Sequence, residues 1–237
     1  ITHEIRSAVT LILAPVEEIM RQKNIPEEIR DDLEVVKRNS ERLLDLVNQI
    51  LDFTKAEQEA FSSQNTWFDI DDLVEKTVQR FTPAAQQKEI QLSHDTPQPM
   101  RICTDREALT KVLSNLLTNA MKFTKDRILV SLTENPEAHT VTISVEDNGT
   151  GIKPTEKEKI FNLFYQSANK PQLPNKGFGI GLAIVSLLVK RMMGKIEVES
   201  EENRFTRFRI TLPQDEQNDL SISVTSPDKT AALRLSL

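Results

Sequence analysis

The first part of the chain carries apolar side chains at spacings of three and four, the pattern of amphipathic helices. In the first segment these positions precede a polar break at residues 21–26: Ile1, Ile5, Val9, Ile12, Val16 and Ile19. In the second segment a spacing of about 3.5 residues, typical of heptads, runs through Ile29, Leu33, Val36, Ser40, Leu43, Val47, Ile50 and Thr54. The pattern predicts an antiparallel helical hairpin.

Each helix of this hairpin has its own apolar stripe, and two helices alone cannot bury both stripes. Pairing with a second copy of the chain would bury them in a four-helix bundle. We therefore expect a homodimer that forms through the hairpin.

The periodicity changes near Trp67. Helices are expected over residues 70–81, 105–123 and 182–193, with short strands near Ile90 and Arg101. Alternating apolar and polar residues predict further strands at residues 128–132, 141–145, 196–198 and 208–212. This order predicts an α+β chain whose second part is an α/β sandwich.

Residues 152–176 form a long proline-containing stretch with one expected helical piece, at residues 156–164. A loop of this length inside a domain is typical of a lid over a ligand site. After Pro213 the sequence is polar and rich in serine and aspartate, which is typical of a linker or tail. The expected organisation is a helical domain at residues 1–60, a second domain at 66–213 and a tail at 214–237.

Composition narrows the function. The chain has 237 residues, a formal net charge of −6 and one cysteine, Cys103, which excludes a disulfide framework. Its scattered basic residues give no reason to expect nucleic-acid binding. No apolar run reaches the length of about 18 residues that a membrane span needs, so no membrane contact is expected of these residues. Because the chain begins inside a helical pattern without an initiator Met, we expect a longer protein with membrane segments upstream.

Five of the six glycines lie in two clusters, Asp147-Asn-Gly149-Thr-Gly151 and Gly177-Phe-Gly179-Ile-Gly181. Glycine permits close approach of backbone amides to a phosphate-bearing ligand. Asp147 ends a strand, where its carboxylate can accept a hydrogen bond from an amine such as that of adenine. The second cluster precedes a helix, whose N-terminal amides favour phosphate. A dinucleotide-binding loop is excluded, because its third glycine would come one residue later and a strand would precede it.

A polar stripe borders the apolar face of the helix expected at residues 105–123. Asn115, Asn119 and Lys122 lie within roughly 60° of arc. An asparagine oxygen can coordinate Mg²⁺, and a lysine ammonium can bind phosphate. Taken alone, such a stripe is more often a solvated helix face. Its combination with the glycine clusters favours a nucleotide site.

His3 lies roughly 165° from the mean direction of the first apolar stripe, so its imidazole is expected to face solvent. An exposed neutral imidazole is a competent nucleophile, and the adjacent Glu4 can take up its proton. Taken alone, an exposed histidine is usually a surface residue. That is our interpretation of His94 and His139.

Five segments, in order, resemble the motifs of sensor histidine kinases. They correspond to the H-box, N-box, first glycine box, F-box and second glycine box: His3-Glu-Ile-Arg6, Asn115-Leu-Leu-Thr-Asn119-Ala-Met-Lys122-Phe-Thr, Asp147-Asn-Gly149-Thr-Gly151-Ile, Phe161-Asn-Leu-Phe164-Tyr and Gly177-Phe-Gly179-Ile-Gly181-Leu. Thr206-Arg-Phe208 with Leu212-Pro213 is similar to the family's closing strand. The resemblance covers residues 1–213.

The resemblance implies a dimerisation and histidine-phosphotransfer bundle joined to an ATP-binding domain of the type shared with DNA gyrase. It implies ATP and Mg²⁺ as cofactors, with Asn119 on the metal and Asp147 on the adenine amine. It places Asn115 and Lys122 near the phosphates. The remaining nucleotide-binding residues that it implies are Phe123, Gly149, Gly151, Lys176, Gly179, Gly181, Leu182 and Thr206.

In the same interpretation His3 attacks the γ-phosphoryl group with help from Glu4. The group then passes to an aspartate of a response-regulator receiver domain, either separate or fused. The resemblance also implies that the chain is the cytoplasmic portion of an inner-membrane sensor.

Some positions depart from the family pattern. Ser7 and Ala8 stand where the family usually has Thr or Asn and then Pro, which puts phosphatase activity and a helix kink in question. Phe178 fills a position that is more often small, and Phe205 replaces a glycine. Two alternatives stay open: a dimeric pseudokinase that binds nucleotide without turnover, and an ATPase of the gyrase or mismatch-repair type.

Overall fold

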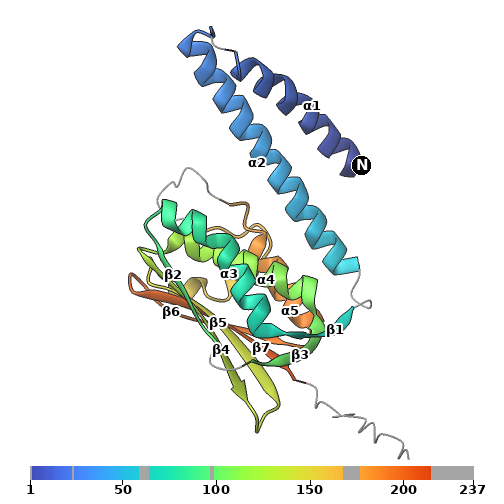
Figure 1. Ribbon diagram of the computed structural model, residues 1–237, viewed down its shortest axis with the longest axis vertical. Coiled ribbons are helices and arrows are strands. Elements are labelled where there is room, and N and C mark those ends of the chain that lie inside the picture. The colour runs from blue at the N-terminus through green and yellow to red at the C-terminus, as the bar shows by residue number, and fades with distance from the viewer. Residues whose placement is uncertain (1, 23, 59–63, 97–98, 168–176, 215–237) are drawn as a thin grey trace, which may run out of the picture.

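The structure is a computed structural model that describes residues 2–22, 24–58, 64–96, 99–167 and 177–214. Its first part is the predicted helical hairpin, made of α1 (Thr2–Met20) and α2 (Glu27–Gln58). α1 and the first part of α2 project away from the rest of the molecule (Figure 1), whereas the second part of α2 packs against it through Leu46, Phe53 and Ala56. Arg6 donates a hydrogen bond of 3.0 Å to the side-chain oxygen of Asn48, which ties the two helices together.

The apolar stripes of the hairpin are only partly covered within one chain. Val9 and Val16 of α1 and Ser40 of α2 are buried. Most of the other stripe residues are exposed: Ile5, Ile12, Ile19, Ile29, Val36, Leu43 and Ile50. A single chain therefore leaves uncovered the apolar surface that the sequence pattern assigns to a bundle core.

The described residues between 65 and 213 form the predicted α/β sandwich, in which helices cover one face of a mixed sheet (Figure 1). The helices are α3 (Ile70–Gln87), α4 (Arg106–Phe123) and α5 (Gly181–Arg191). The sheet order is β2-β4-β5-β7-β6, with bounds Gln91–Asp95, Arg127–Asn135, Thr140–Asp147, Phe205–Pro213 and Lys195–Glu201. Only the β2–β4 pair within this sheet is parallel.

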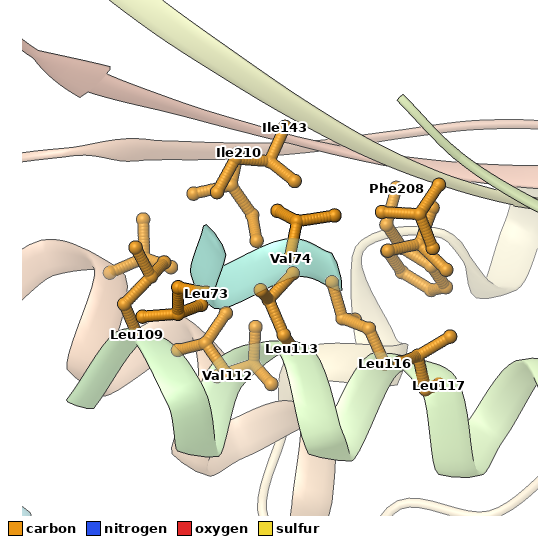
Figure 2. Close-up of a cluster of buried hydrophobic side chains, with 14 of the residues drawn as sticks. Leu73, Val74, Leu109, Val112, Leu113, Leu116, Leu117, Ile143, Phe208 and Ile210 are labelled. Atoms are coloured by element: carbon orange, nitrogen blue, oxygen red, sulfur yellow. The ribbon is translucent and has the colours of Figure 1, made fainter. Parts of the chain in front are cut away.

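The core lies between the helices and the sheet. Figure 2 shows Leu113 and Leu116 of α4 and Val74 of α3 pointing toward Ile143 and Ile210 of the sheet. The alternation of apolar and polar residues accounts for the strand β5. Its inward side chains are buried, while Glu146 on the opposite face pairs with Arg207. Each fully buried aliphatic side chain of this kind contributes about 1.5–3 kcal/mol.

Two local details differ from expectation. A two-stranded antiparallel sheet of β1 (Asn65–Asp69) and β3 (Arg101–Asp105) includes a strand that was not predicted. In β1 only Phe68 is buried, so the segment has almost no apolar alternation to detect. The single helical piece expected at residues 156–164 is wrong, because the chain there forms two 3₁₀ turns, η1 (Pro154–Glu156) and η2 (Lys159–Phe161).

The backbone explains why no α-helix forms at residues 156–164. Asn162, which follows η2, has an extended conformation with ψ 141°. Phe164 has φ +63°, in the left-handed region that L-residues adopt at a cost. Both conformations are incompatible with a continuing right-handed helix.

Candidate active site

A cavity of about 450 Å³ opens between the C-terminal half of α4, the end of β5, the start of β7 and the start of α5. This volume lies in the range of small-molecule sites. Many of the residues predicted to bind nucleotide line it: Asn115, Asn119, Lys122, Phe123, Asp147, Gly179, Gly181, Leu182 and Thr206. The structure thus brings together residues that are up to 91 positions apart in the sequence.

Asp147 is a buried carboxylate at the end of β5, only 4% exposed. Its Oδ1 accepts a hydrogen bond of 2.9 Å from the backbone amide of Gly149, which fixes the orientation of the side chain. Across the sheet, Asp147 is in register with Thr206 of β7, which is also buried. A fixed buried carboxylate in a cavity wall is suited to recognise a hydrogen-bond donor such as an amine.

Gly149 and Gly151 do not line the cavity but make close backbone packing possible. A Cβ on Gly149 would lie 1.9 Å from the carbonyl oxygen of Phe123, at the end of α4. Gly151 has φ +65°, and a Cβ there would lie 2.2 Å from the carbonyl oxygen of Glu201. In this structure both glycines therefore seat the loop after Asp147 against the chain itself.

The polar stripe of α4 faces the cavity rather than open solvent. Asn115 donates a hydrogen bond of 2.9 Å from Nδ2 to the carbonyl of Lys111. A Cβ on Gly181 would lie 2.8 Å from Oδ1 of Asn115, so glycine lets the start of α5 approach α4. The first amides of α5 then lie at the cavity, where the helix dipole favours anions.

The second glycine cluster packs against the segment that resembles the F-box. Gly179 has φ +74°, and a Cβ there would lie 2.5 Å from the carbonyl oxygen of Tyr165. The amide of Phe164 donates a hydrogen bond of 2.9 Å to the carbonyl of Gly179. These contacts position Gly179 and Tyr165 along one wall of the cavity.

Comparison with known proteins agrees with this geometry. Residues 104–216 match the family described as histidine kinase-, DNA gyrase B- and HSP90-like ATPase, and residues 1–59 match the His Kinase A (phospho-acceptor) domain. The sensor histidine kinase YcbM of Bacillus subtilis is 30% identical over 89% of this chain and 68% of its own length. The chain belongs to the sensor histidine kinase family. Its two domains are those of an ATP-dependent protein histidine kinase of two-component signalling.

Other relatives of this histidine kinase are larger. The sensor protein GacS of Pseudomonas syringae is 31% identical over 93% of the chain, which spans 26% of GacS. The sensor protein EvgS of Escherichia coli K12 is 31% identical over 98% of the chain, which spans 20% of EvgS. Full-length ShkA in complex with AMPPNP has a TM-score of 0.75 and 27% identity over 90% of this chain and 44% of that one. These matches confirm the predicted fold class, a helical region followed by an α/β sandwich of the ATP-binding type.

Three predicted residues of the kinase site lie wholly or with their side chains outside the described part of the chain. Lys176 lies outside the described residues. His3 and Glu4 belong to the first turn of α1, but their side chains are outside the described part of the chain.

Among the described residues, no group of three or more His, Cys, Asp or Glu side chains could hold a metal ion. Asn119 lines the cavity, and an amide oxygen is a type of ligand that Mg²⁺ accepts. No described helix is long and apolar enough to span a membrane.

Several residues of the cavity wall were not predicted: Gln49, Phe81, Ala84, Lys88, Thr118, Met121, Ile152, Glu156, Ile160, Tyr165, Gln166, Ser167, Gly177, Phe178 and Phe208. Phe81 and Ala84 of α3 and Lys88, the C-cap residue that follows α3, keep helical spacing, a signal that could have indicated a shared face. Gln49 comes from α2 of the hairpin and has no local signal that points to a nucleotide site.

Asn148 is a structural residue of the kinase site that the sequence did not reveal. Its Oδ1 accepts hydrogen bonds from the side chain of Thr124 and from the amides of Asp126 and Arg127, at 2.9–3.2 Å. Its Nδ2 donates a hydrogen bond of 2.7 Å to Oδ1 of Asp126. Asn148 therefore joins the loop after Asp147 to the turn between α4 and β4.

Replacing Asn148 by alanine is expected to destabilise the chain by about 1–3 kcal/mol, because it leaves several polar groups without their partner. Urea unfolding of the full chain measures this change. Asn135→Ala is a matched control, since Asn135 accepts one hydrogen bond, from Ala138 in the β4–β5 hairpin. Equal losses for the two variants would contradict the role assigned to Asn148.

Tyr165 and Glu156 form a hydrogen-bonded pair on the cavity wall. The phenol donates to Oε1 of Glu156 at 3.1 Å. Burial of the phenol, this hydrogen bond and the negative charge of Glu156 raise the pKa of Tyr165 above its ordinary value of 10.0. The pair joins η1 to the segment that packs against Gly179.

The pKa of Tyr165 is expected to fall in Glu156→Gln, but to stay above its ordinary value, because the charge is removed and the burial is not. Tyr165 is the single tyrosine of the chain, so the absorbance of the phenolate reports on it alone. The exposed neighbour Glu158 provides the control variant, Glu158→Gln. An unchanged pKa in Glu156→Gln would show that the pair does not form in solution.

Proposed function

We propose that this histidine kinase binds ATP in the cavity, phosphorylates His3 and passes the phosphoryl group to an aspartate of a response-regulator receiver domain. The observation that carries the proposal is the meeting of Asp147, the polar stripe of α4 and the start of α5 at one cavity. The match of the hairpin to the phospho-acceptor domain supports His3 as the acceptor. The AMPPNP bound by full-length ShkA supports ATP as the ligand.

The cavity offers a distinct partner for each part of ATP. The carboxylate of Asp147 accepts the hydrogen bond of the adenine amine. Lys122 and the first amides of α5 bind phosphate oxygens, with Asn115 beside them. Asn119 holds Mg²⁺ together with the phosphates, and the ion neutralises their charge when bound.

The transfer step needs His3 in line with the γ-phosphorus. An imidazole nitrogen bonds to the γ-phosphorus while the bond to the β–γ bridging oxygen breaks and ADP leaves. Glu4 takes up the imidazole proton. Because positioning supplies most of the rate, movement of the sandwich relative to the hairpin is the regulated step.

The partners follow from the hairpin. Its exposed apolar residues, Leu11, Ile12, Leu43 and Ile50 among them, support a homodimer in which two hairpins form a four-helix bundle.

We also propose that the chain is divided into a dimerisation and phosphotransfer domain at residues 1–60, an ATP-binding domain at 66–213 and a linker or tail at 214–237. Because relatives are named as sensors, we also propose a place on the cytoplasmic side of a membrane sensor.

The test is incubation of the full chain with γ-labelled ATP and Mg²⁺. A kinase that modifies histidine incorporates label that is lost in acid and kept in alkali. Nucleotide binding without any labelled protein would support a pseudokinase instead. ATP hydrolysis without labelled protein would support a gyrase-type ATPase.

A further inference from the structure

We infer that helix α2 completes the nucleotide site: Gln49 contacts the bound nucleotide, and Arg42 holds α2 in place through its contact with Phe178. The inference rests on the ATP site proposed above. It adds a positioning function to a helix whose apolar stripe is already assigned to the hairpin.

Helix α2 has two different faces. Its apolar stripe, with Leu43 and Ile50, stays exposed within one chain. A second face, roughly 120° away at 100° per residue, contacts the sandwich. This sandwich-facing stripe consists of Arg42, Leu46, Gln49, Phe53 and Ala56, which follow one another at spacings of four and three.

Three apolar residues of the sandwich-facing stripe, Leu46, Phe53 and Ala56, pack against the sandwich. Ala56 is buried, and the partly buried side chains of Leu46 and Phe53 pack against the same core as the sandwich. Asp52, beside this stripe, forms an ion pair of 2.9 Å with Lys111 of α4. Lys111 lies one helical turn before Asn115, so this contact fixes α2 next to the polar stripe of α4.

Gln49 lies between these anchors and reaches the cavity, where it is one of the lining residues. Asn115 and Gly181 line the same cavity and belong to the proposed phosphate side. A glutamine amide carries two N–H donors and one acceptor. The amide of Gln49 therefore donates to a phosphate oxygen of the bound nucleotide.

Arg42 makes the contact at the other end of the stripe. Its guanidinium carbon lies 5.3 Å from the ring centroid of Phe178, within the distance for a cation–π interaction. Phe178 stands in the second glycine cluster and lines the cavity itself. The aromatic ring of Phe178 thus provides one contact for the guanidinium of Arg42.

These contacts link nucleotide binding to the position of α2. When α2 moves away from the sandwich, Gln49 no longer lines the cavity, and the contact between Arg42 and Phe178 is broken. Its affinity for nucleotide is lower, and by reciprocity bound nucleotide stabilises the docked position of α2. The hairpin thereby contributes to the site of the phosphoryl donor as well as carrying the acceptor.

The test measures the dissociation constant for AMPPNP with Mg²⁺ by calorimetry on the full chain. Gln49→Ala is expected to weaken binding about fivefold, the size of one lost hydrogen bond. Arg42→Ala is expected to weaken it about threefold. Arg38→Ala replaces an exposed arginine one turn earlier on α2 and is expected to leave the constant unchanged.

A second measurement separates the Arg42–Phe178 contact from a general loss of stability. In a Phe178→Leu background, which lacks the ring, Arg42→Ala is expected to have no further effect on AMPPNP binding. A purely structural role would lower the unfolding temperature of Gln49→Ala and leave the dissociation constant unchanged, and that result would overturn the inference. If the unmodified chain binds and Asp147→Asn does not, while Gln49→Ala and Arg42→Ala bind normally, only the inference fails. An unmodified chain that does not bind AMPPNP overturns the proposed ATP site together with the inference.

Discussion

Replacing His3 by glutamine is expected to abolish the transfer of label from γ-labelled ATP to the chain, while AMPPNP binds with unchanged affinity. Glutamine keeps a polar side chain but has no nucleophilic ring nitrogen. The loss is therefore in the acceptor and not in the nucleotide site. The measurement is the amount of acid-labile label on the full chain, with AMPPNP affinity determined in parallel by calorimetry.

The Asp147→Asn variant is the counterpart of His3→Gln. It is expected to lose label and nucleotide affinity together, with AMPPNP binding about a hundredfold weaker, because a hydrogen bond to a buried charged group is lost. His94→Gln, at an exposed position of β2, controls for the general effect of replacing a histidine. Label that persists in His3→Gln, or disappears in His94→Gln, would show that another residue accepts the phosphoryl group.

Much of the sandwich could be predicted because local patterns determine it. In β5 the alternation of Val141, Ile143 and Val145 with polar residues matches the burial of every second side chain. β1 could not be predicted from alternation, because only one of its five residues is buried. The 3₁₀ turns could not be predicted either. Phe164 has a left-handed backbone there, and because phenylalanine rarely adopts this conformation, its presence in the sequence does not indicate it.

Some residues of the candidate site could likewise be predicted from local patterns, and others could not. Asn115, Asn119 and Asp147 could be placed because each lies on an element whose geometry is regular. Gln49 could not, since its position depends on how the hairpin docks on the sandwich. The sandwich-facing stripe of α2 mixes charged, amide, aliphatic and aromatic side chains, so hydrophobic periodicity does not single it out.

The glycines show where an inference from residue type needs structure. Gly177, Gly179 and Gly181 of the second cluster line the cavity, whereas Gly149 and Gly151 of the first cluster do not. The immediate requirement at Gly149, however, is the backbone of Phe123, whose carbonyl oxygen would lie 1.9 Å from any Cβ at this position. A glycine next to a ligand site can therefore be needed for the packing that shapes the site as much as for the ligand.

Asp105→Ala is expected to destabilise the chain by about 3–5 kcal/mol, because it leaves a buried arginine without its carboxylate. Asp105 ends β3 and is the N-cap of α4, where its Oδ1 accepts a hydrogen bond of 2.9 Å from the amide of Ala108. Its Oδ2 accepts a hydrogen bond of 2.7 Å from Arg191 at the end of α5, and both side chains are 9% exposed. One residue thus caps the helix of the polar stripe and ties it to the helix that begins at the cavity.

Urea unfolding, followed by the fluorescence of Trp67, measures this loss. Trp67 is the single tryptophan of the chain and lies on β1, in register with Cys103 of β3, close to Asp105. Asp105→Asn keeps an oxygen for the N-cap but not the charge, so its loss should be smaller. Combining Asp105→Ala with Arg191→Leu should recover part of the stability, because the double variant no longer buries a guanidinium that has lost the carboxylate of Asp105. A loss below about 1 kcal/mol for Asp105→Ala, the range of an exposed ion pair, would mean that Arg191 is solvated in the native chain.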